Sequence, residues 1–443
     1  MNFLNIARSL GFYGAIAYTF ILFYGLLVFQ VPVDNFNILL FAIAALYVGT
    51  RGLYIFRYGL KVSRQEVVGA TLLLVCWASV GVNTAFVPEV FDSEGLPAIQ
   101  QVRNHLVFGT IWMLIGAAAS LHQARQSDIV GLLLILALAF AVFMGVRNSD
   151  GVFTVLYSNM TVAAETGDEK ITHLTFGYSA TLIFATAYAF AKKLRPVVFV
   201  LGAAALFPLE SRSAFFIGMV AILLFEFLSG SRWKIVRTVI PLVFAAIAVL
   251  VILQADLIDL DDTRNQRMLM AFGMDEDTSA VGRSEILARS WKGLGDQFLF
   301  GDPTFMAREF GDLGAFIHNL LSAWQYYGFP AFLLFVLGLW LSFNNARRAD
   351  SGWREDAVSS TGFIVLIYII IGMCLSHFVA HRLLWFALGF WLFNTNHLRT
   401  ASDRTSDNHV RRGPGFSLDL KGLLGGGGVS KSKRKRRRQS TRK

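Results

Sequence analysis

Long, uninterrupted apolar runs are the feature that most constrains how this chain can fold. A membrane-spanning helix needs about 20 consecutive, mostly apolar residues, and twelve stretches of the chain approach that requirement. Strands that cross a membrane alternate apolar and polar residues, whereas these runs are continuous, so the sequence predicts helices. The twelve stretches are 13–31, 36–50, 67–86, 106–119, 129–146, 174–191, 197–209, 213–228, 236–253, 320–343, 357–376 and 383–393.

The composition agrees with a polytopic membrane protein. Hydrophobic residues make up 55% of the chain and the mean hydropathy is +0.53, which is too apolar for a soluble protein of this length. We therefore expect an all-α membrane helix bundle of about 12 transmembrane helices. The neighbouring runs 197–209 and 213–228 are short, and a broken hairpin that does not fully cross the membrane is an alternative interpretation for them.

The distribution of Lys and Arg between the loops predicts which side of the bundle is cytoplasmic. Fourteen of these residues lie in connections on one side, within 51–64, at 125, and within 192–195, 232–237 and 347–354, whereas five lie on the other side. Cytoplasmic loops carry the excess of basic residues, so both termini are predicted to be cytoplasmic. The long polar stretch after the ninth run then lies outside.

The predicted organisation has four parts. Residues 1–255 hold the first nine helices, 256–317 form a large periplasmic segment, 318–395 hold the last three helices, and 396–443 form a disordered basic cytoplasmic tail. Nine Lys and Arg within 431–443 supply most of the net charge of +10. Such a run binds anionic headgroups at roughly 1 kcal/mol per residue, so membrane lipids are expected partners and nucleic acid is not.

One helix is predicted inside the periplasmic segment, at about 280–292. Glu285 and Arg289 fall one turn apart on it and can form an ion pair. Three apolar residues of the same stretch form a stripe that can lie on the bundle: Leu287, Trp291 and Leu294.

The connection between the seventh and eighth runs is very short and carries Arg212 between Ser211 and Ser213. A cation at this depth is costly and marks a functional site by default. Snorkelling to the headgroups or a pair with Glu210 would also account for it, but snorkelling does not need the flanking serines. We expect Arg212 to be functional and the two serines to line the same site.

A histidine precedes the tenth run at the predicted outer boundary. The neutral imidazole of His318 can accept a proton near pH 7, and Asn319 beside it can position a sugar hydroxyl. A histidine at a membrane interface is common, so its position alone does not decide its role. His377 and His381, four residues apart in the last outer turn, are a weak metal signal because no acidic ligand follows them.

Further arginines on the outer side are candidate phosphate ligands. Arg283 and Arg382 can each offer paired donors to phosphate oxygens, whereas a solvated charged face is the better interpretation of Arg289. Asp259 and Asp261 form an Asp-x-Asp pattern of the kind that holds a divalent metal. We interpret them as part of a solvated loop, so no metal or other cofactor is predicted.

Three short motifs occur in order on the predicted outer side. They are Ser-Arg-Ser-Ala-Phe-Phe at 211–216, Gly282-Arg283 with Trp291 following, and His318-Asn319-Leu-Leu with Tyr327-Gly328 following. Together they resemble the motifs of the O-antigen ligase and O-antigen polymerase superfamily. The resemblance covers roughly 174–343, and the last two runs also fit, whereas the first five runs match only as membrane helices.

This resemblance implies a metal-independent glycosyltransferase of the bacterial inner membrane. The enzyme would move a glycan from a polyprenyl-pyrophosphate-linked donor to an acceptor hydroxyl on the periplasmic face, with inversion at the anomeric carbon. Arg212 and Arg283, supported by Arg382, would stabilise the pyrophosphate leaving group. His318 would take the proton of the acceptor hydroxyl, and Asn319 would position it.

The acceptor distinguishes the branches of this superfamily. A ligase transfers the glycan to lipid A–core in lipopolysaccharide biosynthesis, whereas a polymerase transfers it to another lipid-linked repeat unit. The His-Asn signature favours the ligase, with the polymerase as the alternative. A lipid-linked glycan flippase or transporter is an alternative from another class. Transporters place charges near the bilayer midplane, often in paired halves, whereas here no halves repeat and polar residues gather outside.

Overall fold

The computed structural model describes the chain in stretches separated by gaps. They are 3–29, 37–58, 62–91, 95, 97–148, 173–209, 211–228, 285–291, 294–295, 298–311, 317, 319–348, 356–377 and 379–393. Every regular element within them is helical, as predicted. Five helical stretches are long and apolar enough to cross a membrane, which indicates a membrane protein: Ser9–Val28, Arg64–Phe86, Asp128–Arg147, Ser322–Arg348 and Ala357–Leu375.

The helices lie close to the predicted apolar runs. In chain order they are α1 (Phe3–Phe23), the π-helix η1 (Tyr24–Val28), α2 (Asn37–Tyr58), α3 (Arg64–Phe86), α4 (Ala98–Ala119), α5 (Asp128–Arg147), α6 (His173–Phe190), α7 (Arg195–Leu206), the 3₁₀-helix η3 (Phe207–Leu209), α8 (Arg212–Leu228), α12 (Phe305–Phe310), α13 (Ser322–Arg348), α14 (Ala357–Leu375) and α15 (Arg382–Leu392). Eleven predicted runs coincide with helices, and 236–253 lies outside the described residues. The predicted total of twelve spans stays a prediction.

Several helices extend further than predicted, including α1, α2, α4 and α13. The helix α2 continues to Tyr58, and Arg51 within it forms an ion pair with Glu66 at the start of α3, at 2.9 Å. The helix α4 begins at Ala98, so Arg103 lies inside a helix and not in a loop. The reason is that an apolar run marks only the part of a helix suited to the bilayer, whereas the helix continues wherever its backbone hydrogen bonds do.

Contacts between helix ends show which connections lie together at each end of the bundle. At one end, which we name the basic end, Arg125 of the α4–α5 connection forms an isolated antiparallel bridge with Asp356, just before α14. The carboxylate of Asp128, at the start of α5, accepts hydrogen bonds from the backbone N–H groups of 192–194, after α6. These are connections that the charge distribution predicts to be cytoplasmic.

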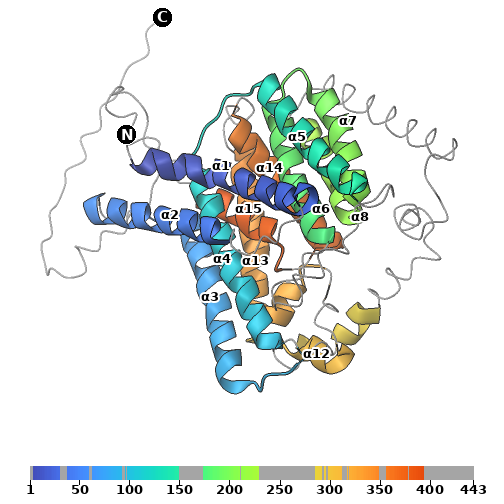
Figure 1. The fold of residues 1–443 in the computed structure, drawn as a ribbon. Helices are drawn as coiled ribbons and strands as arrows, with labels where there is room; N and C mark the ends of the chain where they lie inside the picture. Colours follow the sequence, from blue (N-terminus) through green and yellow to red (C-terminus); the bar gives the residue numbers. More distant parts are fainter. Residues whose placement is uncertain are drawn as a thin grey trace, which may run out of the picture.

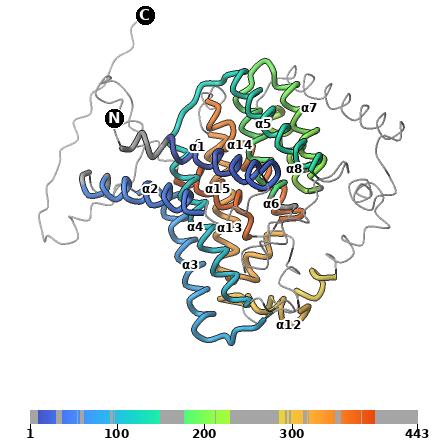
Figure 2. The backbone as a smooth tube through the Cα atoms, viewed as in Figure 1, coloured from blue at the N-terminus to red at the C-terminus, as the bar shows by residue number. Residues whose placement is uncertain are grey.

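The opposite end holds the α3–α4 connection, the start of α13 and the α14–α15 turn. In Figure 1, α3 and α4 reach the lower part of the view, where α12 lies, and Figure 2 shows these two helices running side by side. The carbonyl oxygen of Phe300 accepts hydrogen bonds from Ser79 and Asn83 of α3, at 2.5 and 3.0 Å. Part of the predicted periplasmic segment therefore packs directly on the bundle.

The helix α13 is broken near its start, which the sequence did not predict. Gly328 has a φ of 84°, which ends the regular helix there. The segment 298–302 fills the break. The Phe329 N–H donates to the Phe298 carbonyl oxygen at 2.8 Å, and the Asp302 N–H donates to the Gln325 carbonyl oxygen at 2.7 Å. Residues that are far apart in the sequence thus satisfy backbone groups that the break exposes.

The predicted helix of the periplasmic segment is present at 285–291. Glu285 and Arg289 form the predicted ion pair at 2.5 Å, in an exposed position where such a pair contributes little stability. Leu294 is buried with Met306 and Ile317, and Leu287 packs against this cluster. The prediction for Trp291 was wrong: this side chain is 55% exposed, because the helix turns the face of Ile286, Leu287 and Ser290 inward and leaves Trp291 at its edge.

The apolar helix α15 is short, and it occupies the interior of the bundle. Every residue from Leu383 to Leu392 is buried, with α4, α13 and α14 around it. Glycines allow its close approach to α4: a Cβ on Gly389 would lie 1.9 Å from the Met113 carbonyl oxygen. Such small residues let membrane helices pack backbone to backbone.

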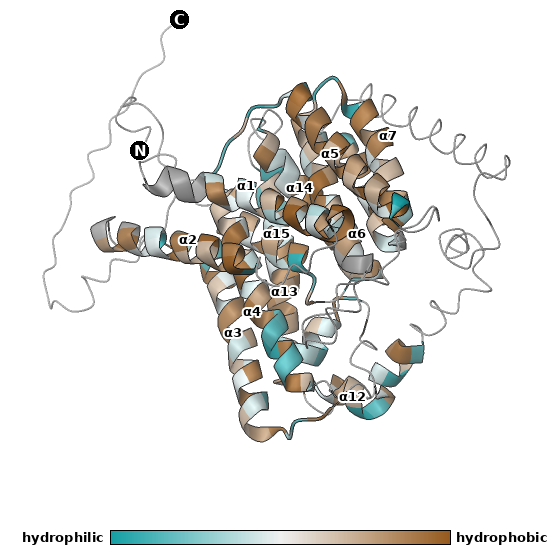
Figure 3. Cartoon of the chain, viewed as in Figure 1, coloured by the Kyte–Doolittle hydropathy of each residue, from teal (hydrophilic) through white to brown (hydrophobic). Residues whose placement is uncertain are grey.

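The outward faces of the bundle are apolar. Large side chains of α3 and α5 are exposed, and Figure 3 shows these helices mostly in brown, the colour of hydrophobic residues. A surface of this extent is suited to lipid tails and not to water. Examples are Leu74, Ile129, Leu133 and Phe143.

We expect Gly389→Ala to destabilise the bundle, because the added Cβ meets backbone that cannot move without shifting α4 or α15. Overpacking of this kind costs about 1–3 kcal/mol. Gly81→Ala in α3 is the matched control, since a Cβ there meets no described atom within 4 Å and helix propensity gains up to about 1 kcal/mol. Thermal midpoints of the purified variants in detergent test this, and equal midpoints would contradict it.

Candidate functional site

Helix N-termini meet at the opposite end of the bundle. The start of α13 is tied to the α14–α15 turn because the Val379 N–H donates to the Ser322 Oγ at 2.9 Å. Two residues later, His381 caps α15 by accepting the Leu383 N–H on its Nδ1, at 3.2 Å. The Tyr178 ring of α6 packs on the His381 ring, with centroids 3.9 Å apart.

The N-terminus of α8 joins the same junction through α6. A Cβ on Gly177, the neighbour of Tyr178, would lie 2.5 Å from the Ser211 Oγ. Ser211 is buried directly before α8, and its Oγ has no hydrogen-bond partner among the described residues. Arg212 is the first residue of α8, although its side chain lies outside what the structure describes, and Ser213 is partly buried in the first turn.

Asn319 shapes the turn that begins α13. Its side-chain Oδ1 accepts the Leu321 N–H at 2.8 Å, and its carbonyl oxygen accepts the Ser322 hydroxyl at 2.7 Å. The Leu320 N–H donates to the Met373 carbonyl near the end of α14, at 2.8 Å. This bond fixes the Asn319 side chain at the start of α13, and its predicted contact with substrate stays a prediction.

Arg382 lies at the first helical position of α15 and is partly buried. Its guanidinium donates to the Tyr18 hydroxyl at 3.4 Å and lies 5.4 Å from the centroid of the Phe108 ring. The structure therefore brings Arg382, Ser211 and Asn319 to one junction. Their predicted roles stay predictions, and both His318 and Arg283 lie outside the described residues.

The two histidines of the last turn form a buried cluster that the sequence did not predict. His377 and His381 are fully or nearly fully buried, their ring centroids are 4.3 Å apart, and the ring of Tyr368 lies 5.1 and 6.0 Å from them. In the part of the chain that the structure describes, no three His, Cys, Asp or Glu residues gather as metal ligands. The useful signal was a pair of histidines followed directly by arginine between two apolar helices.

The environment of His381 keeps its imidazole neutral. Burial lowers its pKa well below the usual value, and the neighbouring His377 and the cationic Arg382 lower it further. Because its Nδ1 accepts a backbone N–H, the proton of the neutral ring is on Nε2. That Nε2 is buried and has no hydrogen-bond partner among the described residues.

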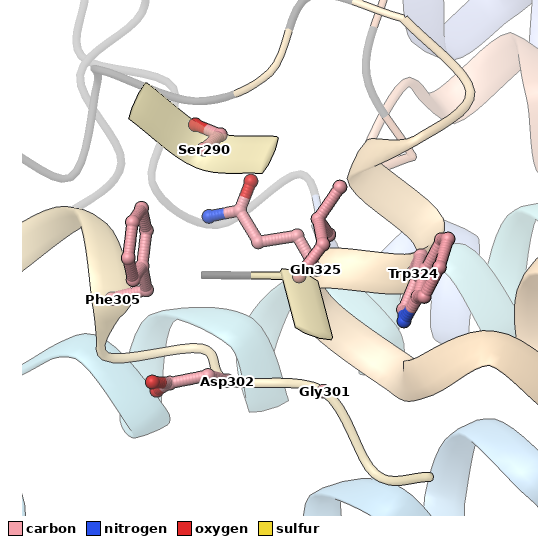
Figure 4. Close-up of a pocket in the computed structure, with 7 residues that line it drawn as sticks. Ser290, Gly301, Asp302, Phe305, Trp324 and Gln325 are labelled. Carbon is pink, nitrogen blue, oxygen red and sulfur yellow. The ribbon is translucent and has the colours of Figure 1, made fainter. Parts of the chain in front are cut away.

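A small cavity lies between the 285–291 helix and α13, as Figure 4 shows. The side chain of Gln325 is 4% exposed, and neither atom of its amide has a partner among the described residues. The cavity measures about 10 Å³, which is close to the room that one water molecule needs. It is too small to hold a sugar. Its lining also includes Ser290, Leu294, Gly301, Asp302, Phe305 and Trp324.

Comparisons with models of known protein families, with curated proteins and with solved structures found no match. The functional interpretation therefore depends on the motifs and on the geometry of the junction.

Acidification should destabilise the protein through His381. Its folded pKa lies below the value of about 6.5 in an unfolded chain, so the unfolded chain binds more protons between the two values. The stability is fully present above about pH 6.5 and is lost as the pH falls toward the folded pKa, by at most about 1.4 kcal/mol per pH unit.

We expect the thermal midpoint of the wild type to fall more steeply between neutral and mildly acidic pH than that of His381→Asn. Asparagine also caps helices but does not titrate. His122, whose pKa is also lowered by burial, is present in both proteins, so its contribution cancels. Equal pH slopes would show that His381 does not carry this dependence.

Proposed function

We propose that this chain is a membrane glycosyltransferase of the O-antigen ligase type, which transfers a glycan from a polyprenyl-pyrophosphate donor to an acceptor hydroxyl. The observation that carries the proposal is the junction at the opposite end of the bundle. The N-termini of α8, α13 and α15 meet there, and arginines are the first residues of α8 and α15. We assign pyrophosphate binding to Arg212 and Arg382, with Arg283 contributing from the periplasmic segment.

The arrangement of helix ends suits a leaving group that gains negative charge. A helix N-terminus carries roughly half a positive elementary charge and presents unpaired N–H groups to an anion. The C-terminus of α14 has the opposite sign and lies at the same place. Its last carbonyls are engaged, because Gly372 accepts the N–H groups of Ser376 and His377, and Met373 accepts that of Leu320. The end of η3 at Leu209 is a second negative end, so three positive ends meet two negative ones at the junction.

The reaction is a direct displacement at the anomeric carbon. The acceptor oxygen forms a bond to C1 of the donor sugar while the bond from C1 to the pyrophosphate oxygen breaks, so polyprenyl pyrophosphate leaves with the electron pair. The acceptor proton passes to His318, the residue before the Asn319 turn. Fixed cations and N–H groups stabilise the charge on the leaving oxygen without reorganising, so the step needs no metal or cofactor.

The sidedness of the bundle supports a periplasmic site. The basic connections cluster at one end, and the rule for Lys and Arg assigns that end to the cytoplasm. The junction of helix N-termini lies at the other end. In a bacterial inner membrane, that is the side on which lipopolysaccharide and other surface glycans are assembled.

We expect His318→Ala to abolish glycan transfer in cells while leaving the amount of protein in the membrane unchanged. Loss of long glycan on lipid A–core, with long polyprenyl-linked glycan accumulating, would identify a ligase. Single repeat units alone would identify a polymerase. His122→Ala at the basic end is the matched control and should transfer normally. An unchanged glycolipid profile in His318→Ala would remove this residue from the mechanism and favour a flippase or transporter.

We expect Arg212→Ala and Arg212→Lys both to lower the rate of glycan transfer by on the order of a hundredfold, as loss of a preorganised donor does. Lysine keeps the charge but lacks the paired donors of a guanidinium. The measurement is transfer by purified protein in lipid nanodiscs. If the lysine variant transfers at the wild-type rate, only a point charge is needed at this position.

A further inference from the structure

The N-terminus of α15 presents a hydrogen-bond donor that the proposed mechanism does not use. The imidazole of His381 turns its Nδ1 toward the helix backbone, where it accepts the Leu383 N–H. Its Nε2 therefore lies on the side of the ring away from that bond. The rings of Tyr178 and His377 adjoin the imidazole, with centroids 3.9 and 4.3 Å away.

The tautomer decides which chemical group this donor can bind. A backbone N–H can only donate, so the Nδ1 that accepts it carries no proton and the Nε2 does. Such a ring cannot take a proton on Nε2 from an acceptor hydroxyl. It can only donate, to the lone pair of an oxygen such as a phosphoryl oxygen, and a charged oxygen makes the stronger hydrogen bond.

The charges around His381 also favour an anion. The charged and titratable groups that face it in the described part of the chain are Arg382, His377, Tyr178 and Tyr368. None of them is a carboxylate, so none of these described groups would repel an anion. The guanidinium of Arg382 follows directly in the chain, and the helix α15 adds its positive N-terminal end.

We infer that His381 and Arg382 together bind a phosphoryl oxygen of the donor's pyrophosphate at the N-terminus of α15, with His381 as a neutral hydrogen-bond donor. The site depends on the proposed function for the source of that pyrophosphate. Tyr178 covers the imidazole and is the half-buried member of the cluster, whereas both histidines are buried. Binding at the buried Nε2 therefore requires the Tyr178 ring to move aside.

Two substitutions separate this role from capping. His381→Asn keeps an acceptor near the position of Nδ1 and so retains the cap, but it removes the Nε2–H. His381→Gln places an amide N–H near the position of Nε2 but loses the cap geometry. The probe is undecaprenyl pyrophosphate, titrated into the full-length protein in lipid nanodiscs. Undecaprenol, which has the same tail without phosphate, is the control ligand.

We expect His381→Asn to weaken undecaprenyl pyrophosphate binding about tenfold or more, the loss typical of a hydrogen bond to a charged group, while undecaprenol binding is unchanged. His381→Gln should lose less affinity for undecaprenyl pyrophosphate than His381→Asn, even where its thermal midpoint is lower. Wild-type affinity in His381→Asn would reduce His381 to a helix cap. An equal loss in a folded His381→Gln would also overturn the assignment.

The same titration separates this site from the proposed function. A wild-type protein that binds undecaprenyl pyrophosphate through His381 but transfers no glycan would retain the site and lose the glycosyltransferase. A protein that transfers glycan but binds undecaprenyl pyrophosphate no more tightly than undecaprenol would lose the site and retain the enzyme.

Discussion

The close approach of α15 to α4 is the contact on which the rest of the structure depends. Glycines at both faces bring the two backbones together: a Cβ on Gly116 would lie 2.1 Å from the Phe386 carbonyl oxygen, and one on Gly389 would lie 1.9 Å from that of Met113. An apolar helix buried on all sides cannot rotate without losing this fit. Because its core is fixed, the N-terminus of α15 is fixed as well, and with it His381 and Arg382.

Two polar groups at the junction, one before α8 and one at the N-terminus of α15, are buried, where an unpaired polar group costs the most free energy. The Ser211 Oγ and the His381 Nε2 are buried and lack hydrogen-bond partners among the described residues, and each such group costs about 1–3 kcal/mol. The low local dielectric that makes them costly also strengthens any hydrogen bond that a ligand brings. A place of this kind in an otherwise apolar bundle is therefore better suited to binding than to stability.

The apolar runs were enough to predict the long helices among the described residues, because continuous hydrophobicity has few other solutions in a membrane, but they did not predict the short α12. They could not predict helix ends outside the bilayer, so α2 and α4 are longer than expected. The break at Gly328 has a local signal in Pro330, which interrupts a helix, but the distant segment 298–302 that fills the break has none. The role of His381 depends on α6, whose Tyr178 packs on it from 203 residues earlier in the chain. Ser211, Asn319 and Arg382 could be selected from the sequence because each follows or precedes an apolar run.

A neutral imidazole beside an arginine offers a second hydrogen-bond donor without a second buried cation. A second buried charge would be costly in this environment, whereas the Nε2–H adds direction without adding charge. A bound anion would favour protonation of His381. Protonation of Nδ1, however, would place its N–H opposite the Leu383 N–H, and because two donors cannot form a hydrogen bond, the cap of α15 would be lost. The cap therefore opposes protonation while the anion is bound, so Arg382 supplies the charge and His381 supplies the direction.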